Sequence, residues 1–232
     1  MIKKLALIIG FIICLSSCGK DYVYRIEGEL SNLEDQTVYA VFEKDNYKVV
    51  DTVACTKPGQ FQIDQNEAGF HCVTIFFADK EHWVTAYLEP GETVKITGDA
   101  NSPLLLQVKG GRTNDKLTAF KKKIAPLLTE LTNLSNSLNS KDLNDTFEET
   151  DIAARLANVN MQLSEEAIRY VKENPNEEAS VVLIQSFFSD PDDTRKIDEL
   201  LALLNPRLKD FYLVKELAAT ITEISENIQR TA

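Results

Sequence analysis

Histidine, tryptophan and cysteine are scarce in this chain of 232 residues, which contains two, one and four of them. A closed zinc site needs three or four ligands at fixed spacing, and His71 and His82 belong to no such cluster. Phosphate-binding loops of the G-x-x-x-x-G-K-[ST] or G-x-G-x-x-G type and the G-x-S-x-G nucleophile elbow are absent. We therefore expect no metal, no cofactor and no catalytic residue, and predict that the protein is not an enzyme.

The four cysteines lack the C-x-x-C spacing of low-pKa redox dithiols. Cys14 and Cys18 lie in the first eighteen residues, before the segment that is expected to fold. Cys55 and Cys72 are therefore the two cysteines of the folded domain. Two such cysteines in an exported protein can form a disulfide. Three alternatives stay open for them: a structural disulfide, two buried thiols, or a redox-active pair.

Basic residues are outnumbered, with 25 lysines and arginines against 36 aspartates and glutamates and a net charge of −11. A strongly acidic body repels phosphate backbones, so we expect no nucleic-acid partner. It also repels anionic membrane surfaces, so any membrane attachment should come from a lipid. The same charge favours solubility.

A membrane-spanning run is missing too, because the apolar stretch 5–15 falls short of the about 20 residues that a bilayer requires. Lys3 and Lys4 precede this stretch and small residues follow it, which is the order of an export signal. The segment Leu15-Ser16-Ser17-Cys18 resembles the lipobox of bacterial lipoproteins, although Ser17 stands where glycine or alanine is usual.

The lipobox resemblance implies that residues 1–17 are a signal peptide and that Cys18 is lipidated. Residues 18–21 would then form a tether to the membrane. We expect a cell-envelope protein that is attached to the outer rather than the inner membrane. The sequence does not distinguish the periplasmic face of that membrane from the cell surface.

Residues 22–111 alternate apolar and polar side chains in short runs that end at turn signals. Such runs, spaced about ten residues apart, predict an antiparallel β-sandwich or barrel. The runs are 22–30, 36–43, 47–55, 60–63, 70–78, 82–88, 93–97 and 104–108.

Residues 112–232 change to helical spacing after Gly110-Gly111, with Thr113 or Asn114 as the expected cap. One apolar stripe runs from Leu117 to Leu138, and Pro126 should kink or split its helix. A polar loop is expected over 135–145. Further helices are expected over 147–171, 177–188 and 189–204, with a last one beginning at Asn205-Pro206. Strands followed by helices predict an α+β fold whose halves pack together.

The β half resembles a known domain in the order of its strands and turns. The residues that carry the resemblance are 24–28, 51–53, 58–63, 88–98 and 110–114 leading into Leu117 and Phe120, with a further similarity over 170–175 and 180–182. Together they resemble the N-terminal domain of unknown function of Bacteroidota lipoproteins, which usually precedes a thioredoxin-like domain.

The resemblance implies a location in the cell envelope and an adjacent thioredoxin-like domain, but no activity. The chain ends at Ala232, where the resembling proteins continue into the thioredoxin-like domain, so no catalytic residue carries over. We expect a lipid-anchored accessory or binding module that meets another envelope protein. One alternative is the sensing or docking half of a split thiol-disulfide oxidoreductase, and another is a glycan- or peptide-binding lipoprotein.

Two features could form a binding surface. Trp83 and Tyr87 share one face of a predicted strand, where they could bind a ligand or simply belong to the core. The helical stripes could also leave a groove open for a partner. The only basic run, Lys121-Lys122-Lys123, is interpreted as a solvated helix face, with anionic headgroups as the alternative partner.

Overall fold

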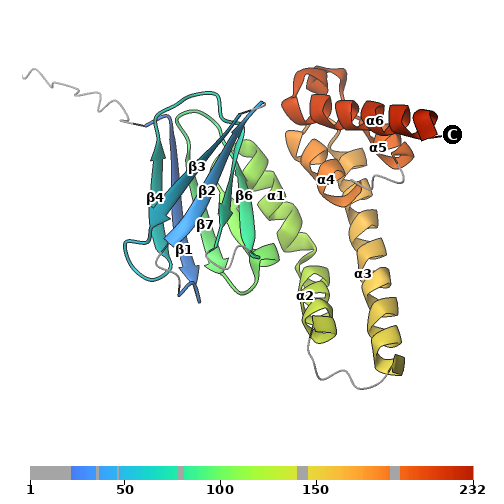
Figure 1. Ribbon diagram of the computed structural model, residues 1–232, viewed down its shortest axis with the longest axis horizontal. Helices are drawn as coiled ribbons and strands as arrows, with labels where there is room; N and C mark the ends of the chain where they lie inside the picture. The colour runs from blue at the N-terminus through green and yellow to red at the C-terminus, as the bar shows by residue number, and fades with distance from the viewer. Residues whose placement is uncertain are drawn as a thin grey trace, which may run out of the picture.

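The computed structural model describes residues 22–34, 37–45, 47–77, 81–139, 146–188 and 194–231 (Figure 1). The predicted signal peptide, tether and lipidated Cys18 lie outside these residues. Strands fill the amino-terminal half and helices the carboxy-terminal half, which confirms the predicted α+β class.

The strands form two four-stranded sheets that face each other as a sandwich. The first sheet has the order β4 (Gln60–Gln65), β1 (Tyr24–Ser31), β7 (Thr93–Asp99) and β8 (Gln107–Lys109). The second has the order β3 (Tyr47–Ala54), β2 (Thr37–Lys44), β5 (Cys72–Phe76) and β6 (Trp83–Tyr87).

The alternation of apolar residues places one side chain in two in the core between the sheets. Ile26 of β1 and Phe42 of β2 are fully buried there. Gly28 continues the inward face of β1 without a side chain, and the Phe61 ring of β4 occupies the space that a Cβ would need. The sandwich therefore has a packed core of its own.

The prediction of wholly antiparallel sheets is wrong, because β1 and β7 pair in parallel from Arg25↔Thr93 to Ser31↔Asp99. Between these strands the chain builds all four strands of the other sheet, and such a long crossover is what a parallel pair requires. The predicted strand over 104–108 is also shorter than expected. A 3-10 turn, η1 (Pro103–Leu105), occupies its start, because Pro103 has no N–H to give to a sheet.

The helical half contains six α-helices and a 3-10 helix, η2, within the described residues. Their bounds are α1 (Arg112–Lys123), α2 (Ala125–Asn139), α3 (Thr146–Glu173), α4 (Glu178–Phe188), α5 (Arg195–Leu201), η2 (Pro206–Asp210) and α6 (Tyr212–Thr231).

The predicted split near Pro126 is confirmed, since α1 ends before Ile124 and Pro126 is the second residue of α2. The predicted loop is wrong over 135–139, where α2 continues beyond the buried Leu134, and residues 140–145 are not described. Of the helix expected over 189–204, residues 189–193 lie outside the described residues, and α5 ends at Leu201, before the expected end. Asn205 caps η2 through a bond from the Arg207 amide (3.0 Å) instead of starting α6.

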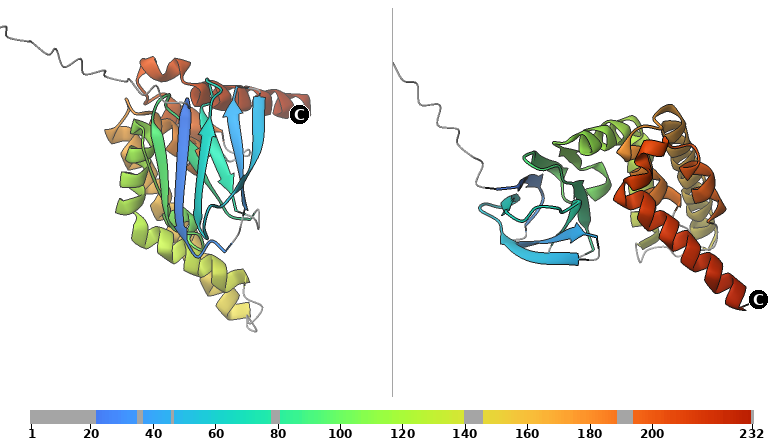
Figure 2. Two further views of the ribbon diagram at one scale, coloured as in Figure 1. Left: turned by 90° about the vertical axis from the view of Figure 1, so that its left-hand side faces the viewer. Right: turned by 90° about the horizontal axis from the view of Figure 1, so that it is seen from above.

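The helices lie to one side of the sandwich, with α1 next to it (Figures 1 and 2). They enclose two apolar clusters, one among α1, α2, α3 and α4 and the other among α3, α4, α5, η2 and α6. Within the described part of the chain, none of the helices has the length and apolar character needed to cross a bilayer.

Candidate binding groove

Helix α1 lies against the side of the sandwich where β6 and β8 are the edge strands of their sheets. An edge strand presents backbone N–H and C=O groups that its own sheet does not use. Two polar side chains on one face of α1, Asn114 and Thr118, bind these groups, and both are almost fully buried.

Each of the two side chains both donates and accepts. The Asn114 Oδ1 atom accepts from the Tyr87 amide of β6 (2.9 Å), and its Nδ2 donates to the Tyr87 carbonyl (2.7 Å) and to that of Gly110 (2.6 Å). The Thr118 hydroxyl accepts from the Val108 amide of β8 (3.1 Å) and donates to the Val108 carbonyl (2.5 Å). Helix α1 thereby joins the edges of both sheets and fixes where its other side chains point.

The prediction that Thr113 or Asn114 caps this helix is wrong. The helix begins at Arg112, whose amide donates to the Glu89 carboxylate (2.7 Å). Thr113 instead donates to Glu178 at the start of α4 (3.0 Å). Because the distant Glu89 carboxylate accepts from the first amide of the helix, Thr113 and Asn114 are available for contacts outside it.

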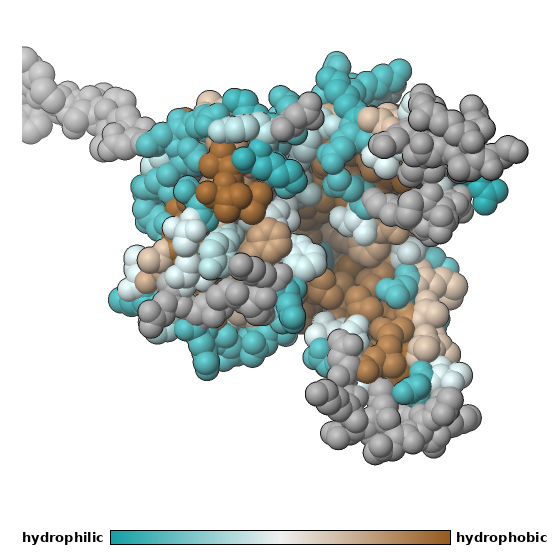
Figure 3. Space-filling model, viewed as in Figure 1, coloured by the Kyte–Doolittle hydropathy of each residue, from teal (hydrophilic) through white to brown (hydrophobic). Residues whose placement is uncertain are grey.

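An open groove lies between the outer face of β6 and helices α1 to α4, with a volume of about 550 Å³. Figure 3 shows apolar residues lining the hollow between the sandwich and the helical half. The described residues that line it are Trp83, Val84, Thr85, Tyr87, Pro103, Leu104, Leu117, Phe120, Lys121, Ile124, Leu128, Leu131, Asn160, Leu163, Ser164, Val182, Leu183, Ser186 and Phe187. This set is called the groove below.

The β6 wall of the groove contains both aromatic residues singled out from the sequence. Trp83 is 54% exposed and its ring lies 6.1 Å from that of Phe76. Tyr87 lies further along the same face and is half-buried, and burial raises its pKa well above the usual range. The shared strand face is therefore a groove wall and not part of the sandwich core.

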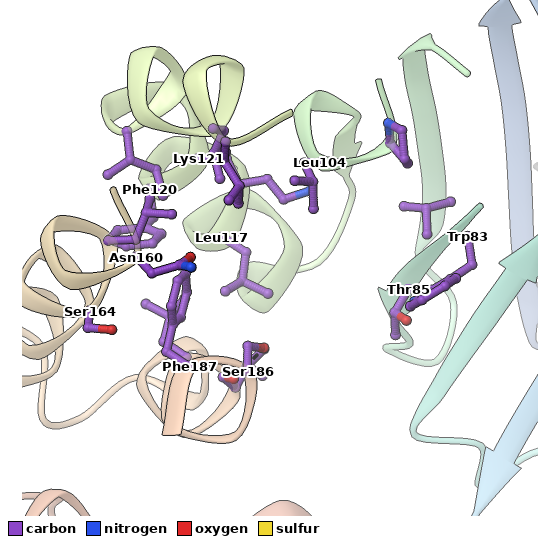
Figure 4. A pocket seen from close by; sticks show the side chains of 18 of the residues that line it. Trp83, Thr85, Leu104, Leu117, Phe120, Lys121, Asn160, Ser164, Ser186 and Phe187 are labelled. Atoms are coloured by element: carbon purple, nitrogen blue, oxygen red, sulfur yellow. Dashed lines mark hydrogen bonds between the residues drawn. The ribbon is translucent and has the colours of Figure 1, made fainter. Parts of the chain in front are cut away.

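The opposite wall consists of helical side chains. Leu117 and Phe120 come from α1, Asn160 and Ser164 from α3, and Phe187 from α4 (Figure 4). The Phe120 and Phe187 rings meet edge to face with their centroids 6.4 Å apart. The helices thus leave this groove open beside the sandwich.

Lys121 corrects the interpretation of the basic run as a solvated face. Lys122 is exposed and Lys123 pairs with Glu166 (3.0 Å), but Lys121 is half-buried and donates to the Leu106 carbonyl (3.1 Å). Loss of hydration lowers the pKa of Lys121. Its spacing from Leu117 and Ile124 places it on the apolar stripe, a signal already present in the sequence.

The comparisons with known proteins concern mainly the sandwich. Residues 24–117 match the family model of a domain of unknown function, DUF4369. The match begins at β1 and ends within α1, so it includes the β6 wall of the groove and Leu117 but not the walls from α2 to α4. Comparison with curated proteins and with solved structures gives no match.

The matched segment, residues 24–117, contains Cys55 and Cys72, and the structure does not join them in a disulfide. Cys55 follows Ala54, which pairs with Thr37 at the start of β2, whereas Cys72 pairs with Glu43 near its end. These positions are about 20 Å apart at the usual strand rise, far beyond the reach of a disulfide.

His71 lies outside the groove, at a second cavity of about 390 Å³ between the matched segment and the start of α6. Its ring stacks on Tyr212 with centroids 4.2 Å apart, and its Nε2 lies 3.1 Å from Asp45 Oδ1. Among the described residues, no three histidine, cysteine, aspartate or glutamate side chains are placed to hold a metal ion together.

Cys72 should be a slow nucleophile in the folded protein. Burial, and secondarily the Glu43 charge, raise the pKa of its thiol from 9.0 to about 12. In a Cys14→Ser/Cys18→Ser chain, we expect Cys72 to react with iodoacetamide at least about thirtyfold more slowly when folded than in urea, because the lost thiolate outweighs its higher nucleophilicity. Peptide mass spectrometry would measure the rate. The alkylation rate of the folded protein should keep rising as the pH passes 9.0. A rate that levels off near pH 9.0 would contradict the raised pKa of Cys72.

Proposed function

We propose that this chain is a lipid-anchored binding module of the cell envelope, without a catalytic site of its own, and that the groove is its binding site. The observation that carries the proposal is the groove, an apolar cavity of small-molecule size with a few polar groups in its wall. The residues lining it come from both halves of the chain, so binding would use the whole fold.

The proposed location in the cell envelope rests on the predicted signal peptide, residues 1–17. An export signal that ends in a lipobox-like Cys18 would attach the acidic body by acyl chains rather than by charge. Such a tether raises the effective concentration of the groove near the membrane and its components. The Bacteroidota origin and the association of this domain with a thioredoxin-like domain, both implied by the resemblance of the β half, are part of this proposal.

The alternative of a redox component receives little support from the geometry. Cys55 and Cys72 lie toward opposite ends of β2, and the Cys72 thiol is buried with a raised pKa. A dithiol that exchanges with partners needs two neighbouring sulfur atoms and a reactive thiolate. The binding function therefore accounts better for the described residues.

The address can be tested by labelling with radioactive palmitate in a bacterial host that processes lipoproteins. We expect the full-length chain to incorporate label and Cys18→Ser to lose essentially all of it, because the Cys18 thiol would carry the lipid. Intact-mass analysis of the purified protein should give a chain that begins at Cys18 with attached acyl groups.

Cys14→Ser is the matched control, since it changes a cysteine of the same segment that should be removed with the signal. It should incorporate label like the unchanged chain. Equal labelling of Cys18→Ser, or an intact mass that includes residues 1–17 without lipid, would reject the anchor.

A further inference from the structure

We propose that the groove holds a single-chain anionic amphiphile of the fatty-acid class, with its alkyl chain along the apolar walls and its carboxylate at Lys121. This inference rests on the proposed use of the groove as a binding site, but not on the lipid anchor. It follows from the charge, the lining and the size of the groove.

The charge of the groove is unusual for this protein. The chain carries a net charge of −11, yet among the described lining residues the single charged side chain is a cation, Lys121. No aspartate or glutamate occurs in that lining. The groove is therefore a local exception that favours an anion.

Lys121 also lacks a counter-ion within the described part of the chain. Its Nζ donates to the Leu106 carbonyl, which uses one of three ammonium donors and supplies no negative charge. Lysine is seldom buried without an acidic partner, because its charge loses hydration. A bound carboxylate would provide the missing partner and accept the remaining donors.

The rest of the lining suits an alkyl chain. Phe120, Leu128, Leu131 and Phe187 line the same groove as Lys121 and are all apolar. Trp83 stands on the β6 side of the groove, across from the helices (Figure 4). Burying each methylene of a ligand against such a surface is favourable by about 0.8 kcal/mol. The volume of about 550 Å³ lies in the range of small-molecule sites.

The position of Trp83 provides a direct measurement, because it is the only tryptophan in the chain. Laurate, dodecanol and dodecyltrimethylammonium share one alkyl chain and differ in headgroup charge. Each would be titrated below its micelle concentration into the full-length protein in lipid nanodiscs while tryptophan fluorescence is recorded. Partition into the disc is common to all variants, so it cancels when they are compared, and titration of discs without protein gives the partition of each ligand, which is subtracted before the ligands are compared.

We expect laurate to bind at least about tenfold more tightly than dodecanol, and dodecyltrimethylammonium more weakly than either. Lys121→Met should remove the preference for laurate while dodecanol still binds, and Lys121→Arg should restore it. Lys122→Met is the matched control, because it removes the neighbouring exposed charge from the same helix, and it should bind laurate like the unchanged protein.

The outcomes separate this inference from the proposed function. If laurate and dodecanol bind equally well, or if Lys121→Met leaves laurate binding unchanged, the inference of an anionic ligand at Lys121 is rejected. The proposal that the groove is a binding site for apolar molecules is then retained. If none of the three probes changes the Trp83 fluorescence, both the amphiphile and the groove as a binding site are rejected.

Discussion

Replacing Gly110 with alanine should destabilise the protein by about 2–5 kcal/mol. Gly110 has φ +99°, a conformation that costs an L side chain about 1–2 kcal/mol. A Cβ there would also overlap the backbone carbonyl of Thr93 in β7, which cannot move without breaking the pairing of β7 with its neighbours. Overlap within a packed structure adds about 1–3 kcal/mol. Urea unfolding followed by circular dichroism would measure the loss.

Gly91→Ala separates the two causes. Gly91 also has a positive φ, +82°, but a Cβ there would have no atom within 4 Å apart from those of its chain neighbours. We expect this variant to cost only the conformational part, about 1–2 kcal/mol. Equal losses for the two variants would show that the close approach to Thr93 contributes nothing.

The arrangement of elements was predictable because it depends on local periodicity. The alternation in β1 and β2 places Ile26 and Phe42 in one core, and a change to helical spacing follows Gly111. Pro126 identifies the junction of α1 and α2 because proline removes a backbone donor. Each of these signals acts within a few residues of itself.

The parallel pairing of β1 with β7 was missed because it joins segments about seventy residues apart. The alternating pattern of Thr93 to Asp99 fits an antiparallel strand and a parallel strand equally well, since both bury every second side chain. The choice between them depends on the path of the whole chain between the two strands.

The groove was predicted only in outline, as apolar helix surface beside a strand face with Trp83 and Tyr87. Lys121 was assigned to solvent because its neighbours, Lys122 and Lys123, hid its place on the apolar stripe. Asn114 was taken for a cap because asparagine favours that role and its partner strand lies far away in the sequence. In both cases a residue type suggested the common local role, and the tertiary contact determined the actual one.

Replacing Asn114 with alanine should cost about 3–5 kcal/mol and loosen α1 from the sandwich. The side chain is 1% exposed and serves three backbone groups: the amide and carbonyl of Tyr87, and the carbonyl of Gly110. A buried backbone group left without a partner costs about 1–3 kcal/mol, and alanine can serve none of them. Urea unfolding would measure the total. Hydrogen exchange at the Tyr87 amide should quicken, because that donor loses its acceptor.

Two variants test whether the bonds, rather than the residue, matter. Asn136→Ala removes an exposed asparagine from α2 and should change stability by less than about 0.5 kcal/mol. Asn114→Asp retains an acceptor for the Tyr87 amide but sets a carboxylate against two carbonyl oxygens, so it should be at least as destabilising as alanine. Should Asn114→Asp prove as stable as the unchanged protein, the two donated bonds would have no part in holding α1 against β6.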